Sequence, residues 1–356
     1  MRYEWRDSNG QKYLYVKADS HYDLGVCTGK GLVKQIEFIR MAIQGMAEMF
    51  KMDITKFQKI ANLYLPYIPQ HYLDEITGIT DGVNEVSEMK FALQDIQFQA
   101  LFLNIVHGQI TPSLPPGQNL IPQGCTAFGA INNDGSIVTG QNYDADGRLQ
   151  PAHSWVLHEL ADEPLVFSHR LGAILGIPMA KNEHGLVFTV NLVQSNVKAP
   201  IMVPRFVLVR EALAKCKTAE EAYKTLFSEE KFPFSLNLLI SDRKKIIAVQ
   251  VHPEQIRPVY VKKTIVQSNQ YDYIDWVQYL RNPTYSQERQ IYAEQKLAEI
   301  YTTNTRITND DLLNILRDSP IICRDQGGGI GTTVAFMTKE SFGVGTAKDT
   351  IGKLPI

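Results

Sequence analysis

The sequence predicts an α+β fold in which two packed antiparallel sheets carry a helical cover. Apolar residues recur at three- and four-residue steps over most of the first hundred residues, a spacing typical of amphipathic helices. After residue 125, short segments of alternating polarity pair across turn residues, which is typical of hairpins. A proline-rich stretch separates the two parts, and no repeat interrupts either of them.

The first part begins with a weakly alternating segment, residues 3–17, which we expect to form an edge hairpin around Gly10. The stretch from His107 to Gly124 contains several prolines, which resist both helix and strand, so we interpret it as an exposed connector. Helices are predicted between these segments at Gly31–Phe50, Asp53–Tyr64, Pro69–Asp81 and Asn84–Gln99.

The second part is predicted to contain mostly hairpins, with helices clustered between them. Asp134-Gly135 supplies the turn of the first hairpin, and Thr218 with Glu221 forms a capping box at the start of a helix. Strands are predicted at Cys125–Ile131, Ser136–Tyr143, Ser154–Glu159, Leu165–His169, Gly185–Val193, Leu236–Ser241, Ile246–Val251, Val259–Ser268, Thr332–Met337 and Phe342–Gly345. Helices are predicted at Pro204–Cys216, from Thr218, and at 285–302 and 308–317.

The composition is that of an ordinary globular chain and argues against two classes of partner. Of the 356 residues, 44% are hydrophobic and 21% are charged, and 36 basic residues nearly balance 38 acidic ones. A net charge of −2 gives no reason to expect binding to nucleic acid or to an anionic membrane. No apolar run approaches the roughly 18 residues of a membrane span, and the N-terminus lacks a secretory pattern, so we expect a cytoplasmic protein.

The four cysteines, Cys27, Cys125, Cys216 and Cys323, lie far apart without a C-x-x-C pair, which favours free thiols in a reducing compartment. Cys125 differs from the others because it follows Gly124 at the end of the connector. If the bond between these two residues is cut, Cys125 becomes a chain start. Its thiol, of pKa about 8.5, and its amine, of pKa about 7.7–8.0, then provide a nucleophile and a base on one residue.

The same cysteine is able to cut the chain. Glycine has no Cβ to hinder approach to its carbonyl, so the Cys125 thiol can attack the Gly124–Cys125 bond and form an ester-like intermediate that water resolves. The alternative is a structural role, because a free cysteine in a strand packs as a small apolar residue. Composition alone favours the structural role.

Other candidate sites carry weaker signals. The glycine-rich segment Gly327–Thr332 lacks the lysine of a phosphate-binding loop and opens a strand, so we interpret it as a flexible loop. The histidines of the second part have no acidic or cysteine partner at ligand spacing. We therefore predict no metal site and no cofactor.

Segments on both sides of Cys125 resemble a known family. The segments Gly124–Phe128 and Gly140–Asp144 are similar to the opening hairpin of the acyl-coenzyme A:6-aminopenicillanic acid acyltransferase-like family of N-terminal-nucleophile hydrolases. That family is related to the bile salt hydrolases and the penicillin V acylases. Further segments resemble it in the same order, over about residues 20–345: Tyr72–Gly82, Asn182–Asn191, Asn237–Asp242, Gln267–Asn269 and Gly331–Ala335.

This resemblance implies a four-layer αββα sandwich, the fold of N-terminal-nucleophile hydrolases. It also implies a precursor that is cut between Gly124 and Cys125. The products are a helical prosegment, residues 1–124, and a catalytic portion, residues 125–356, which together form one globular unit. The resemblance therefore predicts that the two cleavage products associate, and it leaves open whether the protein also forms an oligomer.

The resemblance assigns Cys125 as the nucleophile and, through its freed amine, as the base. Asp144 matches the carboxylate that orients this amine. Asn269 matches the asparagine whose side-chain amide donates to the oxyanion, and the second donor is the N–H of Leu192, directly after Asn191. The alternative to these catalytic roles is that Asp144 and Asn269 are structural turn residues at the ends of strands.

Three more positions belong to the predicted site. Arg289 resembles an arginine that pairs with a carboxylate of the site such as Asp144, and its alternative is a solvated charge on a helix. Asn142 and Asn191 are expected to support the site. Gln141 stands where the bile salt hydrolases carry an arginine, three residues before the aspartate. This difference disfavours a bile-salt substrate and favours the acyltransferase-like branch.

We expect an amide hydrolase that cuts the linear C–N bond of a small N-acyl compound through a thioester acyl-enzyme. Hydrolysis is our first choice because water always competes as the second nucleophile, and no segment resembles a phosphate site for coenzyme A. The first alternative is an acyltransferase that moves an acyl group from a thioester or an amide to an amine. The second alternative is a scaffold or binding module that never cuts itself. The expected partner is the small-molecule substrate, with no nucleic acid and no membrane.

Overall fold

The computed structural model describes residues 1–342 apart from short gaps, and residues 343–356 also lie outside the description. Cys323, the centre of the predicted connector, the start of the glycine-rich segment and the end of the last predicted strand therefore lie outside the described residues. No described helix is both long and apolar enough to cross a bilayer. The gaps are residues 9, 50–51, 116–123, 174–178, 229–231, 273, 282–283, 304–305, 319–320, 323–328 and 338–340.

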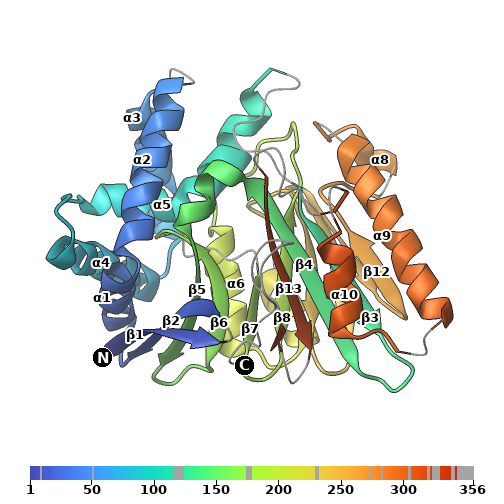
Figure 1. Ribbon diagram of the computed structural model, residues 1–356. Helices are drawn as coiled ribbons and strands as arrows, with labels where there is room; N and C mark the ends of the chain where they lie inside the picture. The colour runs from blue at the N-terminus through green and yellow to red at the C-terminus, as the bar shows by residue number, and fades with distance from the viewer. Residues whose placement is uncertain are drawn as a thin grey trace.

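Two sheets pack face to face, and helices cover the outer face of each sheet (Figure 1). This arrangement confirms the predicted αββα sandwich. The larger sheet has the order β1-β2-β5-β6-β7-β8-β9-β10-β11, with strands Arg2–Ser8, Gln11–Ala18, His153–Leu160, Val166–Leu171, Met179–Asn182, Val187–Leu192, Leu236–Ser241, Ile246–His252 and Gln255–Tyr260. The smaller sheet has the order β12-β3-β4-β13-β14, with strands Thr264–Gln267, Thr126–Ile131, Ile137–Asp146, Gly329–Met337 and Ser341–Phe342.

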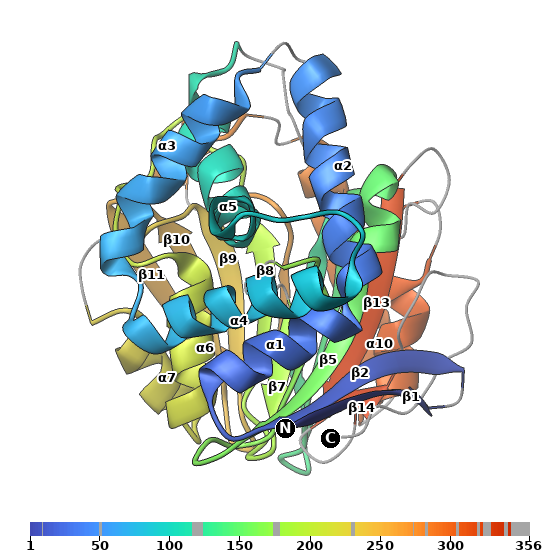
Figure 2. The ribbon, with the colours of Figure 1, turned by 90° about the vertical axis from the view of Figure 1, so that its left-hand side faces the viewer.

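The helices of the first part lie together over one end of the larger sheet (Figure 2). They are α1 to α5, at His21–Gly31, Val33–Met49, Ile54–Tyr64, Gln70–Val86 and Leu93–Ile105, with short turns at Leu65–Tyr67, Val106–Ile110 and Thr111–Ser113. Helices α6 and α7, at Arg205–Lys215 and Ala219–Leu226, cover the rest of that sheet. A short turn at Gly147–Ala152 precedes β5, and the smaller sheet is covered by α8, α9 and α10 at Ile274–Val277, Thr284–Thr303 and Asn309–Leu316.

Strand alternation separates the core into layers. On β2, Leu14 and Val16 point to the helices, whereas Tyr13 and Tyr15 point to the space between the two sheets. Cys125 belongs to the same cluster between the sheets as these tyrosines. Cys125, the residue directly before β3, therefore faces the interior of the sandwich.

One feature of the sheet topology differs from the prediction. We expected antiparallel pairs throughout, but β2 runs parallel to β5, with Leu14 opposite Val156. A parallel pair needs a long crossover connection, and here the whole helical part lies between the two strands. The first part is therefore not only a helical cover, because β1 and β2 extend the larger sheet.

Three predictions of single elements are wrong. Helix α1 was not predicted because its glycines lower the helix propensity of the segment. The helix predicted over Asn84–Gln99 is interrupted at residues 87–92, and its two ends belong to α4 and α5. The Asn84 side chain binds both the N–H and the C=O of Phe91 and so turns the chain between these helices. The strand predicted at Val259–Ser268 is split into β11 and β12, which belong to different sheets.

Helices α1 and α4 touch through their backbones at four glycines. A methyl group at Gly25 would lie 2.1 Å from the Glu75 carbonyl oxygen, and one at Gly78 would lie 2.1 Å from that of Tyr22. Gly29 and Gly82 make similarly close approaches. The close packing of the two helices, which no other residue permits, therefore offsets the low helix propensity of the glycines.

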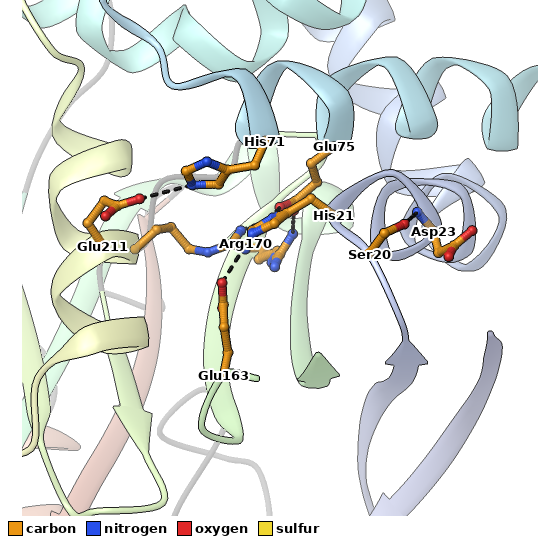
Figure 3. A network of polar contacts seen from close by, with 9 residues as sticks. Ser20, His21, Asp23, His71, Glu75, Glu163, Arg170 and Glu211 are labelled. Atoms are coloured by element: carbon orange, nitrogen blue, oxygen red, sulfur yellow. Dashed lines mark hydrogen bonds and ion pairs between the residues drawn. The ribbon is translucent and has the colours of Figure 1, made fainter. Parts of the chain in front are cut away.

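A buried ion network joins this helix pair to the second part (Figure 3). Its hub is the carboxylate of Glu75 on α4, which is fully buried. Arg210 of α6 binds it through two nitrogens at 3.0 and 2.9 Å, and Arg170 of β6 lies 3.5 Å away. His21 of α1 lies 3.1 Å from Glu75 through Nδ1 and 3.1 Å from Glu163 through Nε2. Four segments of the chain thus meet at one carboxylate.

The charged groups of this network keep one another ionised although they are buried. Burial alone raises the pKa of Glu75, but Arg210, the hydrogen bond to His21 and Arg170 together hold that pKa well below its usual value. Burial opposes the charge on His21, but the hydrogen bonds to Glu163 and Glu75 outweigh it and raise the pKa of His21 to about 9. The imidazole is therefore a cation at neutral pH.

Gly78→Ala is expected to destabilise the protein, because the new methyl group collides with the backbone of Tyr22, which has no room to yield. Overpacking of this kind costs about 1–3 kcal/mol in the free energy of unfolding. Gly45→Ala is the matched control, since a methyl group at Gly45 in α2 meets nothing within 4 Å. Urea unfolding of both variants measures the difference, and equal stabilities would contradict the proposed helix contact.

The stability of the protein is expected to fall with rising pH because of His21. The pKa of His21 is higher in the folded chain than its ordinary value of 6.5, so its contribution is complete below pH 6.5 and is lost as the pH rises through about 9. The loss is at most about 3 kcal/mol. His21→Gln should remove this fall. Urea midpoints between pH 6 and about 9.5 measure it, and parallel curves for the two proteins would refute the role of His21.

Candidate active site

Cys125 lies directly before β3 and is fully buried. The N–H of Gly124 donates to the carbonyl of Asp144 at 2.8 Å, and Sγ of Cys125 lies 3.9 Å from the same oxygen. The register of β3 and β4 pairs Thr126 with Asn142, so Cys125 stands opposite Tyr143. The predicted bond to be cut and the predicted carboxylate residue thus meet at one end of this hairpin.

The intact chain keeps the Cys125 thiol protonated at neutral pH. Burial raises the pKa of this thiol above its ordinary value, and the charge of Asp144 raises it further. A hydrogen bond with the Asp144 backbone, the charge of Arg289 and a hydrogen bond with Asn269 lower the pKa without cancelling the effect of burial. The thiol therefore needs a base before it can act as a nucleophile.

The side chain of Asn269 lies beside Cys125 and is held at both ends. Its Nδ2 donates to the carbonyl of Leu192 at 2.7 Å, and its Oδ1 accepts from Nη2 of Arg289 at 2.7 Å. An amide nitrogen carries two hydrogens, so the bond to Leu192 leaves one hydrogen for an acceptor at Cys125.

The backbone N–H of Leu192 faces the same region. The N–H of Val193 donates to Ser235 at 3.1 Å, so Val193 points toward β9. Successive residues of a strand direct their backbone groups to opposite sides, whereas the N–H and C=O of one residue share a side. The N–H of Leu192 therefore points away from β9, on the side where its carbonyl meets Asn269.

Arg289 reaches from α9 into the site and is 1% exposed. Besides its bond to Asn269, Nη2 lies 3.3 Å from the carbonyl of Cys125, and Nε lies 3.3 Å from Oγ1 of Thr126. The alternative of a solvated helix charge is therefore wrong. The guanidinium binds the oxygen of Asn269 and so turns the amide nitrogen toward Leu192.

The Gln141 side chain binds the backbone of β8 at the residue directly after its pairing with β7. Its Oε1 accepts from the N–H of Val190 at 3.0 Å, and its Nε2 donates to the carbonyl of Val190 at 2.7 Å. The Asn191 side chain lies 3.0 Å from Nε2 of Gln141 and donates to the carbonyl of Gln267 at 2.7 Å. The two side chains thus bind the sheets together directly beside Leu192.

Asn142 and Asp144 lie on the other face of β4. Tyr143 belongs to the cluster between the sheets, so alternation directs its two neighbours toward the helical cover. Asn142 follows this rule, since its Nδ2 lies 3.3 Å from the carbonyl of Ile322. Asp144 is fully buried. Its predicted bond to the Cys125 amine stays a prediction, because that amine exists only after the cut.

Two histidines lie beside Tyr143 and were not expected in the site. Nδ1 of His153 lies 2.9 Å from Nε2 of His169, and both rings lie within 5.4 Å of the Tyr143 ring. Burial lowers the pKa of His153 to about 4, so the pair is neutral at physiological pH. Within the described ranges, no group of three or more potential ligands could hold a metal ion.

Arg205 was also not predicted from the sequence, although it lies near the nucleophile. It is the first residue of α6, it is 3% exposed, and its guanidinium carbon lies 5.0 Å from the centre of the Phe234 ring. Burial lowers the pKa of Arg205 to about 10, while the neighbouring Tyr143 and Cys125 act in the opposite direction. One signal was available in the sequence, since a cation is unfavourable in the first turn of a helix.

Among curated proteins, the chain is 24% identical over 233 residues to the Beta-alanyl-dopamine/carcinine hydrolase of Drosophila melanogaster. The match covers 60% of this chain and 56% of the relative. The chain therefore spans just over half of the length of that protein.

Solved structures provide weaker likenesses. The Caenorhabditis elegans ortholog of N-acylethanolamine-hydrolyzing acid amidase is 16% identical with a TM-score of 0.47, over 60% of this chain and 92% of that one. A mutant of the conjugated bile acid hydrolase from Clostridium perfringens is 14% identical with a TM-score of 0.48, over 65% of this chain and 92% of that one.

The family model described as acyl-coenzyme A:6-aminopenicillanic acid acyl-transferase matches residues 131–330, more than half of the chain. The match begins after Cys125 and includes Asp144, Asn269 and Arg289. It agrees with the resemblance seen in the sequence and with the αββα sandwich. The chain therefore belongs to the acyl-coenzyme A:6-aminopenicillanic acid acyl-transferase family, a family of amide hydrolases and acyltransferases of the N-terminal-nucleophile type.

Proposed function

We propose that this chain is a cysteine amide hydrolase that cuts itself between Gly124 and Cys125. The observation that carries the proposal is the position of Asn269, which is held between Arg289 and the Leu192 carbonyl at 2.7 Å on each side, next to a buried cysteine. With the N–H of Leu192, whose carbonyl Asn269 binds, this amide would supply two donors for the charge that develops on a carbonyl attacked by sulfur.

In the self-cleavage step, Sγ of Cys125 attacks the carbonyl carbon of Gly124. A carbon–sulfur bond forms, the carbon–nitrogen bond breaks, and the Cys125 nitrogen takes a proton and becomes an amine. Water then hydrolyses the ester-like bond, which releases the Gly124 carboxylate and restores the thiol. The bond between the Gly124 N–H and the Asp144 carbonyl supports this step, because it fixes the residue under attack against β4.

In turnover, the freed amine of Cys125 takes the proton of its own thiol, and the thiolate attacks the amide carbonyl of the substrate. Asn269 and the N–H of Leu192 stabilise the oxyanion, and the protonated amine of Cys125 gives its proton to the leaving amine. Water then hydrolyses the thioester. Asp144 is assigned to orient the amine, as the family resemblance implies.

Hydrolysis is the first choice for the second half of the reaction. Water reaches a thioester without a dedicated site, and the Drosophila relative is a hydrolase by name. If an amine takes the place of water, the same site is an acyltransferase. The rival from another class is a scaffold that is never cut.

The buried network around Glu75 supports the proposal that the two products stay together after the cut. Glu75 and His21 belong to residues 1–124, whereas Arg210 and Arg170 belong to residues 125–356. Separation would break these ion pairs and expose to water the apolar cluster that residues of both parts share.

Cys125→Ala is expected to remain a single chain, whereas the wild-type protein yields two fragments, the second of which begins with Cys125. The reason is that the Cys125 thiol adjoins the bond to be cut. Cys216→Ala is the matched control and should be cut normally, since Cys216 lies at the end of α6. Intact-mass spectrometry after incubation at neutral pH measures the result. A wild-type chain that stays whole would support the scaffold.

Asn269→Ala in the cut protein is expected to lower kcat by about 10²–10³-fold with little change in KM, because it removes one oxyanion donor. The measurement uses the best substrate from a screen of N-acyl amino acids, penicillins and β-alanyl amines. Asn196→Ala, at an exposed position, is the control. An unchanged kcat in Asn269→Ala would remove this residue from the mechanism.

A further inference from the structure

Arg205 is a buried cation without an anionic partner among the described residues. Its guanidinium makes no ion pair and no hydrogen bond to any residue in the described ranges, and it lies over the face of Phe234. The other buried arginines of the described residues each have an oxygen partner, and that of Arg170 is Glu75 at 3.5 Å. Arg210 is bound by Glu75 at 2.9 and 3.0 Å, and Arg289 has three oxygen acceptors.

A charge of this kind is costly to keep. Removing a guanidinium from water costs several kcal/mol, and the protein usually recovers this with a carboxylate or with several hydrogen bonds. Contact with an aromatic face recovers only about 1–2 kcal/mol. The position of Arg205 thus implies a partner that the described residues do not provide.

The N-terminus of α6 adds a second positive electrostatic potential beside the guanidinium of Arg205. The residue before the helix is Pro204, and no side chain caps the first backbone N–H groups. These N–H groups and the helix dipole favour an anion at the N-terminus of a helix. The positive end of the helix dipole repels the charge of Arg205 when no anion is bound. Both would attract the same bound anion.

The surroundings of Arg205 are aromatic and neutral. His107 lies 6.0 Å from Phe234 between ring centres, and burial together with the charge of Arg205 lowers the pKa of His107 to about 3. Tyr143 stands opposite Cys125 on the hairpin, and the charge of Arg205 acts on both residues. The unpaired cation therefore belongs to the neighbourhood of the thiol and not to a distant surface.

We propose that Arg205, with the N-terminus of α6, binds a carboxylate group of the substrate, so that the enzyme acts on N-acyl compounds that carry a carboxylate, such as N-acyl amino acids. This inference rests on the proposed function, since it assumes that Cys125 attacks the acyl group. A planar guanidinium matches a carboxylate in shape and charge. A substrate whose only charge is an ammonium group would be repelled by Arg205.

The test compares N-acyl amino acids with their methyl esters on the cut wild-type enzyme and on Arg205→Gln. The wild type should have a kcat/KM at least about 10-fold higher for the acid, a factor that corresponds to one charge-assisted bond. Arg205→Gln should raise KM for the acid by a similar factor and leave the ester unchanged. Arg243→Gln, at an exposed arginine, is the control for the loss of one charge.

The outcomes separate this inference from the proposed function. Equal kcat/KM for acid and ester in the wild type, or an equal loss for both in Arg205→Gln, would overturn the carboxylate site while the hydrolase stands. If no amide is cut, calorimetry with the free N-acyl amino acid still tests the site. Binding to the wild type that Arg205→Gln loses would support it, and absence of binding to the wild type would refute it. If Arg205→Gln does not fold, the comparison of acid and ester in the wild type decides.

Discussion

The contacts of the Arg289 guanidinium hold the candidate site together. This one group binds the carbonyl of Cys125, the hydroxyl of Thr126 and the oxygen of Asn269, so it fixes the start of β3 and the Asn269 amide to one helix. The charge is useful because it is buried, since a hydrogen bond from an ion in a low-dielectric interior is stronger and better oriented than one in water. Without it, Asn269 would be free to exchange its oxygen and nitrogen, and the donor would be lost.

Polar side chains also determine how the two sheets meet. The space between the sheets of a sandwich is usually apolar, but here Gln141 and Asn191 cross it with hydrogen bonds of 2.7–3.0 Å. Such bonds fix the relative position of the sheets more exactly than apolar contacts, which tolerate sliding. The amides therefore give the Leu192 backbone a fixed place relative to Cys125.

Local patterns in the sequence predicted much of the fold, and long-range pairing limited the rest. The β3–β4 hairpin followed from alternation and an Asp-Gly turn, and α7 from the Thr218 capping box, because both depend on neighbours in the chain. The parallel pairing of β2 with β5 has no local signal. Arg205 escaped notice for the same reason, since nothing in its own segment shows that it lies near Cys125. The roles of Cys125, Asp144 and Asn269 came from family resemblance, whereas the direction of the Leu192 N–H needed the register of β8 and β9.

The β1–β2 hairpin has a further consequence if the chain is cut at Cys125. The larger sheet would then consist of two strands from one polypeptide and seven from the other, joined by the parallel ladder between β2 and β5. Backbone hydrogen bonds between two polypeptides of this kind amount to strand complementation. The fragments would copurify as one species under native conditions and part only when the sheet itself is denatured. Expressed alone, the second fragment would expose β5 as a bare edge and would tend to aggregate.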